Sequence, residues 1–241
     1  MARARQTPDA AVATAPEKRV AEIINLDPPA LRGGELALVL AAERLFAEHG
    51  IAGVSLRQVV HAAGQKNMSA AHYHFGSRDG LLRAVMELRM SRINSCRSEL
   101  LARAPPSSAG HDLRFYVEAF VLPLSDQLTP RPEGNYCLRF LEQYRHFPTD
   151  YELLLRLEPT AFQMAEQIKR LLSYLPKPIA EARLNNAWSM IVAALAAMEE
   201  HMSDSRLRER DLPLLVADLV DTMTSALSAP LSPQTLSQLP S

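Results

Sequence analysis

Apolar side chains recur at intervals of three and four residues through most of the 241-residue chain. This is the period of an amphipathic helix, and it first appears over residues 35–49, before Gly50. Two short helices follow at about 55–63 and 68–75, and a long one covers about 79–103. Further helices are predicted at about 111–127, 135–147, 151–175, 179–202 and 211–228. No alternation typical of strands occurs, so the predicted fold class is all-α.

Prolines, glycines and changes in composition divide the chain into four parts. Residues 1–33 are predicted to be a flexible arm, because they are rich in alanine, proline and charge. Three short predicted helices occupy residues 34–80, and longer ones occupy residues 81–228. The tail, 229–241, is predicted to be disordered.

The formal net charge of the chain is only −1, so charge is informative only locally. No aspartate or glutamate occurs from Gly50 to Arg78, and this stretch carries Arg57, Lys66 and three histidines. Such an asymmetry favours an anionic partner, while a solvated basic surface is the simpler alternative.

The two cysteines, Cys96 and Cys137, form no CxxC pair, and the N-terminus lacks an apolar signal core. No apolar run approaches the roughly 20 residues that span a bilayer. His72 and His74 are two positions apart and do not face each other on a helix. We therefore expect a cytoplasmic protein with no metal site, no cofactor and no membrane contact.

The three short helices have the order helix, turn, helix, with Gly64 in the turn. Ser55 is a good N-cap for the second helix, and a short third helix fits the DNA major groove, about 12 Å wide. Small residues at its start allow the backbone of the helix to approach DNA closely, and the tyrosine and histidines that follow reach phosphates or base edges. The pattern predicts a helix-turn-helix motif.

The pieces "LFAEHG", "GVSLRQV", "AAG" and "YHFGSRDGLL" occur in this order between Glu35 and Val85. In sequence and spacing this segment resembles the TetR family of bacterial transcriptional regulators. The resemblance implies an N-terminal helix-turn-helix DNA-binding domain over residues 34–80. It also implies a C-terminal antiparallel helical bundle over residues 81–228 for ligand binding and dimerisation. The remainder of the chain fits the family in size and helical class and carries no further motif.

The resemblance also implies roles for individual residues. Ser55 matches a helix cap that touches a phosphate, and Arg57 matches a position that reaches phosphate or base. Tyr73 and His74 match phosphate contacts, and Arg78 matches a phosphate clamp. The full set of expected DNA contacts is Ser55, Arg57, Lys66, Asn67, Ser69, Ala70, His72, Tyr73, His74 and Arg78.

One departure concerns the turn "GQKN", which is one residue longer than the family pattern. Counted back from Phe75, Asn67 occupies the usual N-cap position, and asparagine is a good cap. The residues that read bases are therefore left open. Arg57 as a free surface charge, Arg78 as a complement to a helix end and Lys66 as a solvated loop lysine are the alternatives.

Two C-terminal segments carry apolar stripes, and the segment over residues 190–198 is apolar all round. A helix with two apolar faces can cover its own core and also pair with a symmetry mate. The predicted dimer interface comprises Leu184, Trp188, Ile191, Leu195, Met198, Leu215, Leu219 and Met223. The alternative is that both helices lie inside the bundle.

Aromatic and methionine side chains are frequent in the middle helices. Such residues line apolar pockets, and they also fill ordinary cores. The candidate effector pocket comprises Met86, Met90, Phe120, Tyr136, Phe140, Tyr144, Phe162, Met164 and Trp188. Arg139, Arg145 and His146 are the candidates for meeting a carboxylate or phosphate.

The sequence thus predicts a homodimeric repressor that binds a palindromic double-stranded DNA operator and responds to a bulky, mostly apolar small molecule. The resemblance further implies that ligand would tilt the long helix that starts near Asp79 and change the separation of the two recognition helices. An activator or an adaptor that does not bind DNA is the alternative. An all-α enzyme is a remote one, because no catalytic motif is present.

Overall fold

The computed structural model describes residues 31, 33–66, 68–103, 112–131, 134–148 and 151–239, and it is all-helical over these ranges. The predicted arm is almost entirely outside them. The helices are α2 (Gly34–His49), α3 (Leu56–Ala62), α4 (Met68–Phe75), α5 (Arg78–Ala102), α6 (Leu113–Ser125), α7 (Cys137–Arg145), α8 (Tyr151–Leu157), α9 (Pro159–Leu171), α10 (Lys177–Ser203), α11 (Leu212–Ser228) and α12 (Pro233–Ser237), with 3-10 turns η1 (Asp126–Leu128) and η2 (Glu209–Asp211). The all-α prediction is confirmed.

Two predictions about the secondary structure were wrong. The single helix expected over 151–175 is two helices, α8 and α9, and Pro159 occupies the first turn of the second one. Proline has no N–H to donate to a helical hydrogen bond, and its fixed φ angle suits the first turn of a helix. The chain therefore breaks before Pro159, and α9 begins there. The tail predicted to be disordered contains α12, whose N-cap Ser232 accepts a hydrogen bond from the Thr235 N–H at 3.2 Å.

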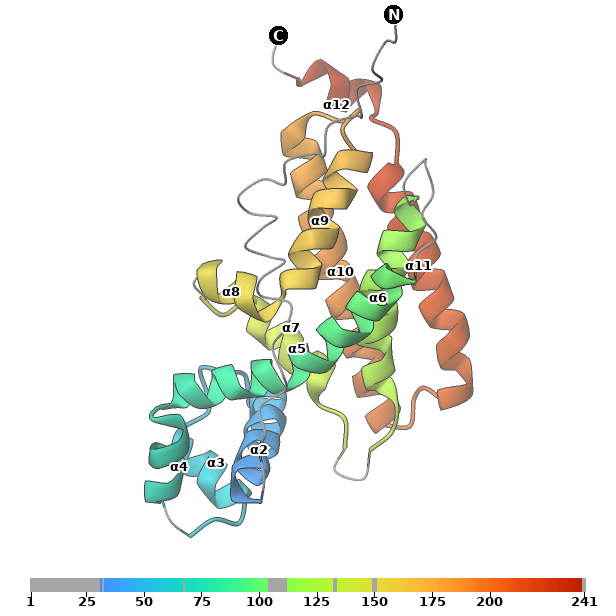
Figure 1. Ribbon diagram of the computed structural model, residues 1–241. Helices are drawn as coiled ribbons and strands as arrows, with labels where there is room; N and C mark the ends of the chain where they lie inside the picture. The colour runs from blue at the N-terminus through green and yellow to red at the C-terminus, as the bar shows by residue number, and fades with distance from the viewer. Residues whose placement is uncertain are drawn as a thin grey trace, which may run out of the picture.

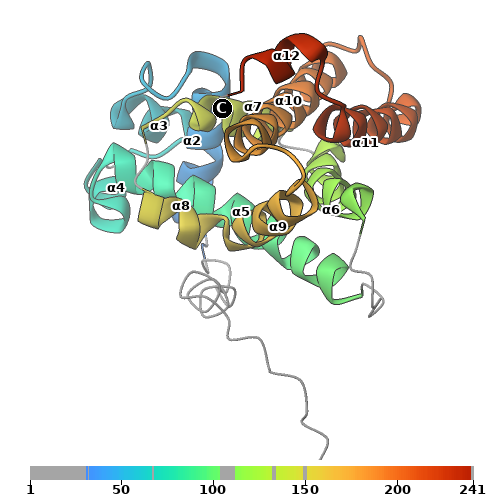
Figure 2. The ribbon, with the colours of Figure 1, turned by 90° about the horizontal axis from the view of Figure 1, so that it is seen from above.

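Helices α2, α3 and α4 form a small N-terminal domain at one end of the molecule, and α5 runs from it into the larger domain (Figure 1). The buried face of α2 carries Leu38, Ala42 and Phe46 at helical spacing. In the larger domain α5, α6, α9 and α10 pack on one another, and Figure 2 shows them grouped when the molecule is seen from above.

The small domain is joined to the larger one through both α5 and α7, because α2 packs against each of them. On the α7 side, the rings of Phe46 and Phe140 stack with centroids 6.2 Å apart. On the α5 side, the buried Glu43 carboxylate accepts two hydrogen bonds of 2.5 Å from the guanidinium of Arg89. The junction therefore combines ring packing with a buried ion pair.

Helix α7 is held at its N-terminus by a carboxylate from α10. Glu199 is buried, and its two oxygens accept hydrogen bonds from the backbone N–H groups of Leu138 (3.1 Å) and Arg139 (3.0 Å). Burial raises the pKa of Glu199, and these N–H donors oppose the rise. This contact fixes α7, and through it α2, to the centre of the larger domain.

One segment, Glu209–Ser237, is long and apolar enough to cross a membrane by length and composition alone. Helix α11 occupies part of it, and Leu219, Met223 and Leu227 pack into the core of the larger domain. This is weak evidence for a membrane span. The segment does leave apolar surface exposed, including Leu214, which is 73% exposed.

Candidate DNA interface and ligand cavity

The second helix of the N-terminal domain begins at a capping box. The Ser55 hydroxyl accepts from the Gln58 N–H at 3.3 Å, and the Gln58 side chain accepts from the Ser55 N–H at 2.8 Å. The helix ends at Gly64, whose φ of +66° is left-handed, and the Gln65 N–H bonds to the Val60 carbonyl at 3.0 Å. Both predicted boundaries of this helix are confirmed.

The longer turn before α4 is partly accommodated by packing. The Gln65 side chain lies beside Gly34, where a Cβ atom would meet it at 3.2 Å, and Met68 packs against the core. Asn67 lies outside the described residues, as does the side chain of Ala70, so their expected DNA contacts stay predictions.

Helix α4 buries one side and exposes the other. Ala71 is fully buried and Phe75 packs against the core, which fixes the helix on the domain. His72, Tyr73 and His74 are exposed, and the Tyr73 ring is 86% exposed. Ser69 on α4, Lys66 in the turn and Ser55 and Arg57 at the start of α3 are also exposed. An aromatic side chain left this open contributes little to folding, so it is available to a partner.

The two histidines of α4 already use one ring nitrogen each. Nδ1 of His72 lies 3.1 Å from the Gly76 carbonyl oxygen, which can only accept, so Nδ1 carries the proton and Nε2 remains for other contacts. Nδ1 of His74 lies 2.7 Å from a carboxylate oxygen of Glu35 on α2. His74 thus ties α4 to α2, in addition to the expected role at a phosphate.

Arg78 has two partners within the protein. Its guanidinium is half-buried and donates to the Ile51 carbonyl and to the Asp79 carboxylate, both at 3.4 Å. These contacts are long, which is typical of weak hydrogen bonds. The Arg78 side chain therefore links the start of α5 to the turn after α2, whereas Tyr73 is exposed to solvent.

The junction of α4 and α5 depends on two residues that the sequence reasoning missed. Ser77 is the N-cap of α5, since its hydroxyl accepts from the Gly80 N–H at 3.1 Å. A Cβ atom on Gly80 would lie 1.9 Å from the Phe75 carbonyl oxygen, so only glycine allows this approach. The signal in the sequence was a serine three positions before a glycine at a helix start.

The larger domain contains a cavity of about 400 Å³ between α5, α6, α7, α8, α9 and α10. Five of the predicted pocket residues line it, namely Met90, Phe120, Tyr144, Phe162 and Trp188. The other four do not. Met86, Phe140 and Met164 are fully buried in the core, and Tyr136 lies beneath the guanidinium of Arg139. Aromatic and methionine content alone does not distinguish a lining residue from a core residue.

Polar groups reach the cavity from several helices. Arg145 lines it and is bound to Glu142 at 2.8 Å and to the Ser189 hydroxyl at 3.0 Å. Glu158 also lines it, and burial raises the pKa of that carboxyl group. Next to the cavity, the Asn94 amide donates to the Leu157 carbonyl at 2.8 Å. The sequence reasoning did not single out Glu158, because its position follows from the break between α8 and α9.

The predicted dimer stripe lies mostly inside the protomer. Ile191, Leu195, Leu219 and Met223 are all buried there, so they belong to the core, and Leu184 and Trp188 line the cavity. Met198 and Leu215 are partly buried. The stripe was assigned to the wrong face because spacing marks an apolar face without saying which neighbour covers it. The outward residues of α10 and α11 include Met190, Ala193, Ala197, Leu214 and Ala217.

No group of three or more metal-ligating side chains gathers anywhere in the described part of the chain. Cys137 is buried, and burial raises the pKa of its thiol well above the ordinary range. A thiol of this kind is unreactive at neutral pH.

Comparison with known proteins agrees with this geometry. Residues 38–85, which cover most of α2 through the first turns of α5, match the bacterial regulatory proteins of the tetR family. No curated protein matches the chain. A TetR family transcription regulator from Marinobacter aquaeolei VT8 is 19% identical, covers 78% of this chain and 94% of its own, and superposes with a TM-score of 0.51. This likeness concerns the fold.

A second structure, described as the molecular basis for control of antibiotic production by a bacterial hormones, is also 19% identical. It covers 79% of this chain and 95% of its own, with a TM-score of 0.45. The match over α2, α3 and α4, together with the exposed face of α4, identifies the motif. Residues 38–85 therefore form an N-terminal domain like that of the bacterial regulatory proteins of the tetR family.

Proposed function

We propose that the protein is a homodimeric repressor that places α4 in the major groove of a palindromic DNA operator. The observation that carries this is the exposed, acid-free face of α4, with the Tyr73 ring 86% exposed. A tyrosine and two histidines on a helix that presents no carboxylate suit a polyanion.

The contacts divide into two kinds. Ser55, Arg57, Lys66, Tyr73 and Arg78 would contact the phosphate backbone, which fixes the position of the domain without reading sequence. Ser69, Ala70 and His72 on α4, with Asn67 before it, would lie nearer the base edges. His72 suits this role because its Nε2 is not used by the Gly76 contact.

The dimer would form through the outward faces of α10 and α11. These faces expose Met190 and Leu214 (49% and 73% exposed) beside small alanines. Alanine allows helices to approach closely, and two helices from each protomer would give a four-helix interface. Two-fold symmetry would then require an operator with matching half-sites.

The effector would occupy the cavity of the larger domain as a bulky, mostly apolar small molecule. Its binding would act on DNA through α5, which carries Met90 of the cavity wall and begins beside α4. Helix α7 offers a second route, since Tyr144 lines the cavity and Phe140 stacks on Phe46. The protein would act in the cytoplasm as a non-catalytic regulator, without membrane contact.

The test is a gel-shift titration of the full-length protein on DNA from its own upstream region, with salt raised from about 50 to about 200 mM. We expect affinity to fall steeply with salt, because phosphate contacts release counterions. Tyr73→Ala should weaken binding about tenfold on all sequences, whereas His72→Ala should change which sequence is preferred.

Tyr174→Ala is the matched control, because Tyr174 is also exposed (63%) but lies between α9 and α10 in the larger domain. It should bind DNA as the unmodified protein does. Absence of binding, or binding that does not respond to salt, would overturn the DNA-binding proposal. Equal losses for Tyr73→Ala and Tyr174→Ala would overturn the assignment of the α4 face.

A further inference from the structure

A buried guanidinium without a hydrogen-bond partner lies beside the cavity. Arg97 on α5 is fully buried, and its Nε, Nη1 and Nη2 atoms have no partner within the described residues. An isolated buried charge is strongly unfavourable, and buried cations in proteins are normally paired. Burial lowers the pKa of Arg97 to about 10, so it is still a cation at neutral pH.

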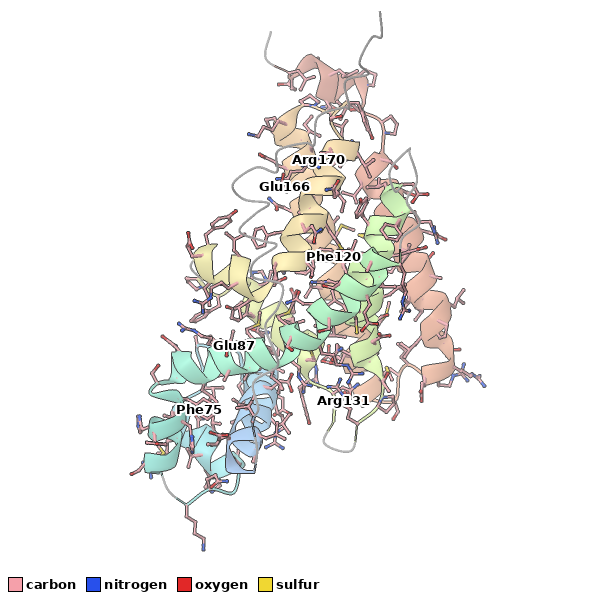
Figure 3. The ribbon with its side chains drawn as sticks, viewed as in Figure 1. Phe75, Glu87, Phe120, Arg131, Glu166 and Arg170 are labelled. Carbon is pink, nitrogen blue, oxygen red and sulfur yellow. The ribbon has the colours of Figure 1, made fainter. Side chains whose placement is uncertain are left out.

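Arg97 does not itself line the cavity, but it packs behind residues that do. Its Cζ atom lies 4.7 Å from the centroid of the Phe120 ring and 5.8 Å from that of Trp188, and both rings line the cavity. Glu158, whose charge acts on Arg97, lines it too. Arg97 also follows the lining residue Met90 by two helical turns, so the two share one face of α5. Figure 3 labels Phe120 in the middle of the larger domain.

The aromatic rings stabilise the cation through their faces but accept none of its directional N–H hydrogen bonds. A planar anion fills this need, because a carboxylate can accept two parallel N–H bonds from one guanidinium. We propose that the cavity binds a small organic anion, with an apolar body against its aromatic wall and one carboxylate group that accepts hydrogen bonds from Arg97. This inference rests on the proposed function, since it specifies the chemistry of the effector.

Neither of the two charged groups that line the cavity, Glu158 and Arg145, takes this role. Glu158 makes no ion pair with Arg97 in the described part of the chain, and burial raises the pKa of its carboxyl group, which weakens it as a counterion. Arg145 already donates to Glu142 and to Ser189. Arg97 is therefore the cation whose donors remain for a ligand.

The chain offers a direct optical signal for this site. Trp188 is its single tryptophan, lies against Arg97 and lines the cavity, so the tryptophan emission of the whole protein reports on it. The probes are sodium dodecanoate and its neutral counterpart dodecanamide, which differ in charge at the head group. The pair biphenyl-4-carboxylate and biphenyl-4-carboxamide, followed by calorimetry, supplies an aromatic body instead of an alkyl one.

We expect the acid of at least one pair to change Trp188 emission or release heat, and to bind at least about tenfold more tightly than its amide. Arg97→Met should abolish this preference. Without ligand it should also raise the melting temperature by about 3 °C, because it replaces an unpaired buried charge with an apolar chain of similar length. Glu158→Gln should keep or strengthen binding of the acid, since it removes a competing carboxyl group.

Arg92→Met is the matched control, because Arg92 lies on the same helix but is exposed. It should keep both the preference for the acid and the melting temperature. The proposal is overturned if no acid binds more tightly than its amide, or if Arg97→Met retains the preference. It is equally overturned if Arg145→Met, and not Arg97→Met, loses it, or if Arg97→Met lowers the melting temperature.

A gel shift with and without the bound acid separates this inference from the proposed function. Arg97-dependent binding of the acid with no change in DNA affinity would leave the anion site standing and contradict the regulatory link. Salt-dependent DNA binding with no preference for either acid over its amide would contradict the anion site and leave the DNA-binding proposal standing.

Discussion

Glu43 and Arg97 are both buried charges, but they belong to different domains and have different surroundings. Glu43, in the N-terminal domain, is 2% exposed and accepts two hydrogen bonds of 2.5 Å from Arg89. Arg97, in the larger domain, is fully buried and has no hydrogen-bond partner among the described residues. The first arrangement suits a fixed joint, and the second suits a site completed by a ligand.

The two charges are connected by α5. Arg89 and Arg97 both lie on this helix, eight residues and therefore about 12 Å apart along its axis. A ligand that draws Arg97 into the cavity would displace α5, and the ion pair would carry that displacement to Glu43 on α2. The ion pair at the junction of the two domains and the unpaired charge beside the cavity would thus be linked through one helix.

The largest loss of unfolding free energy is expected when the Glu43–Arg89 ion pair between the two domains is broken. Glu43→Ala leaves the guanidinium of Arg89, whose side chain is 13% exposed, without its carboxylate. Removing one partner of a buried ion pair costs about 3–5 kcal/mol of unfolding free energy. Urea denaturation followed by circular dichroism would measure it.

Glu99→Ala is the matched control, because Glu99 pairs with Arg103 on the same helix at an exposed site. Exposed pairs contribute at most about 1 kcal/mol. If both substitutions had equally small effects, the Glu43 pair would be no stronger than a surface contact, and the contrast between the domains would fail.

The same contrast explains what the sequence could predict. The helices of the N-terminal domain follow from local signals, such as the Ser55 cap and the left-handed glycines Gly50 and Gly64. The Glu43–Arg89 pair joins residues 46 positions apart, and no local pattern connects them. The Glu199 cap of α7 spans 61 positions in the same way.

In the larger domain, spacing identified apolar faces but not their neighbours. Trp188 was assigned both to a pocket and to a dimer face, and it lines the cavity. Leu195 sits on the same predicted stripe and is fully buried. Arg97 was overlooked because a lone arginine on a helix with polar neighbours reads as a surface residue until the packing of α6 and α10 against it is known.

A second, smaller effect is expected at the junction of α4 and α5. Gly80→Ala places a Cβ atom 1.9 Å from the Phe75 carbonyl oxygen, so the backbone of the junction must shift. Such overpacking costs about 3 kcal/mol. The shift should also weaken DNA binding, because α4 leaves its position on the domain.

Ser77→Ala at the same junction removes only the cap of α5, which costs about 1 kcal/mol. Thermal melts and gel shifts of both variants would rank them. Equal DNA affinity for the two would mean that the position of α4 does not depend on the close approach at Gly80.

The smallest effect concerns the proton on Glu158. Burial raises the pKa of its carboxyl group from the ordinary value of 4.5, and the charge of Arg97 opposes the rise. At pH values between the ordinary pKa in the unfolded chain and the raised pKa in the folded protein, the folded state binds more protons than the unfolded state. The unfolding free energy therefore increases as the pH falls through the folded pKa. Glu158→Gln should remove this contribution, which urea titrations from about pH 7 to about pH 5 would detect as a flatter slope.

Repeating the pH titration with a ligand in the cavity tests whether Arg97, unlike the paired Glu43, is completed by a ligand. If dodecanoate binds at Arg97, its negative charge lies near Glu158 and takes away the cation that lowers the pKa of that carboxyl group. The pH dependence due to Glu158 should then move to higher pH when the acid is present, and dodecanamide should leave it in place. A pH dependence that does not respond to the acid would mean that no ligand carboxylate binds between Arg97 and Glu158. Arg97 would then be a fixed structural charge, as Glu43 is in the N-terminal domain.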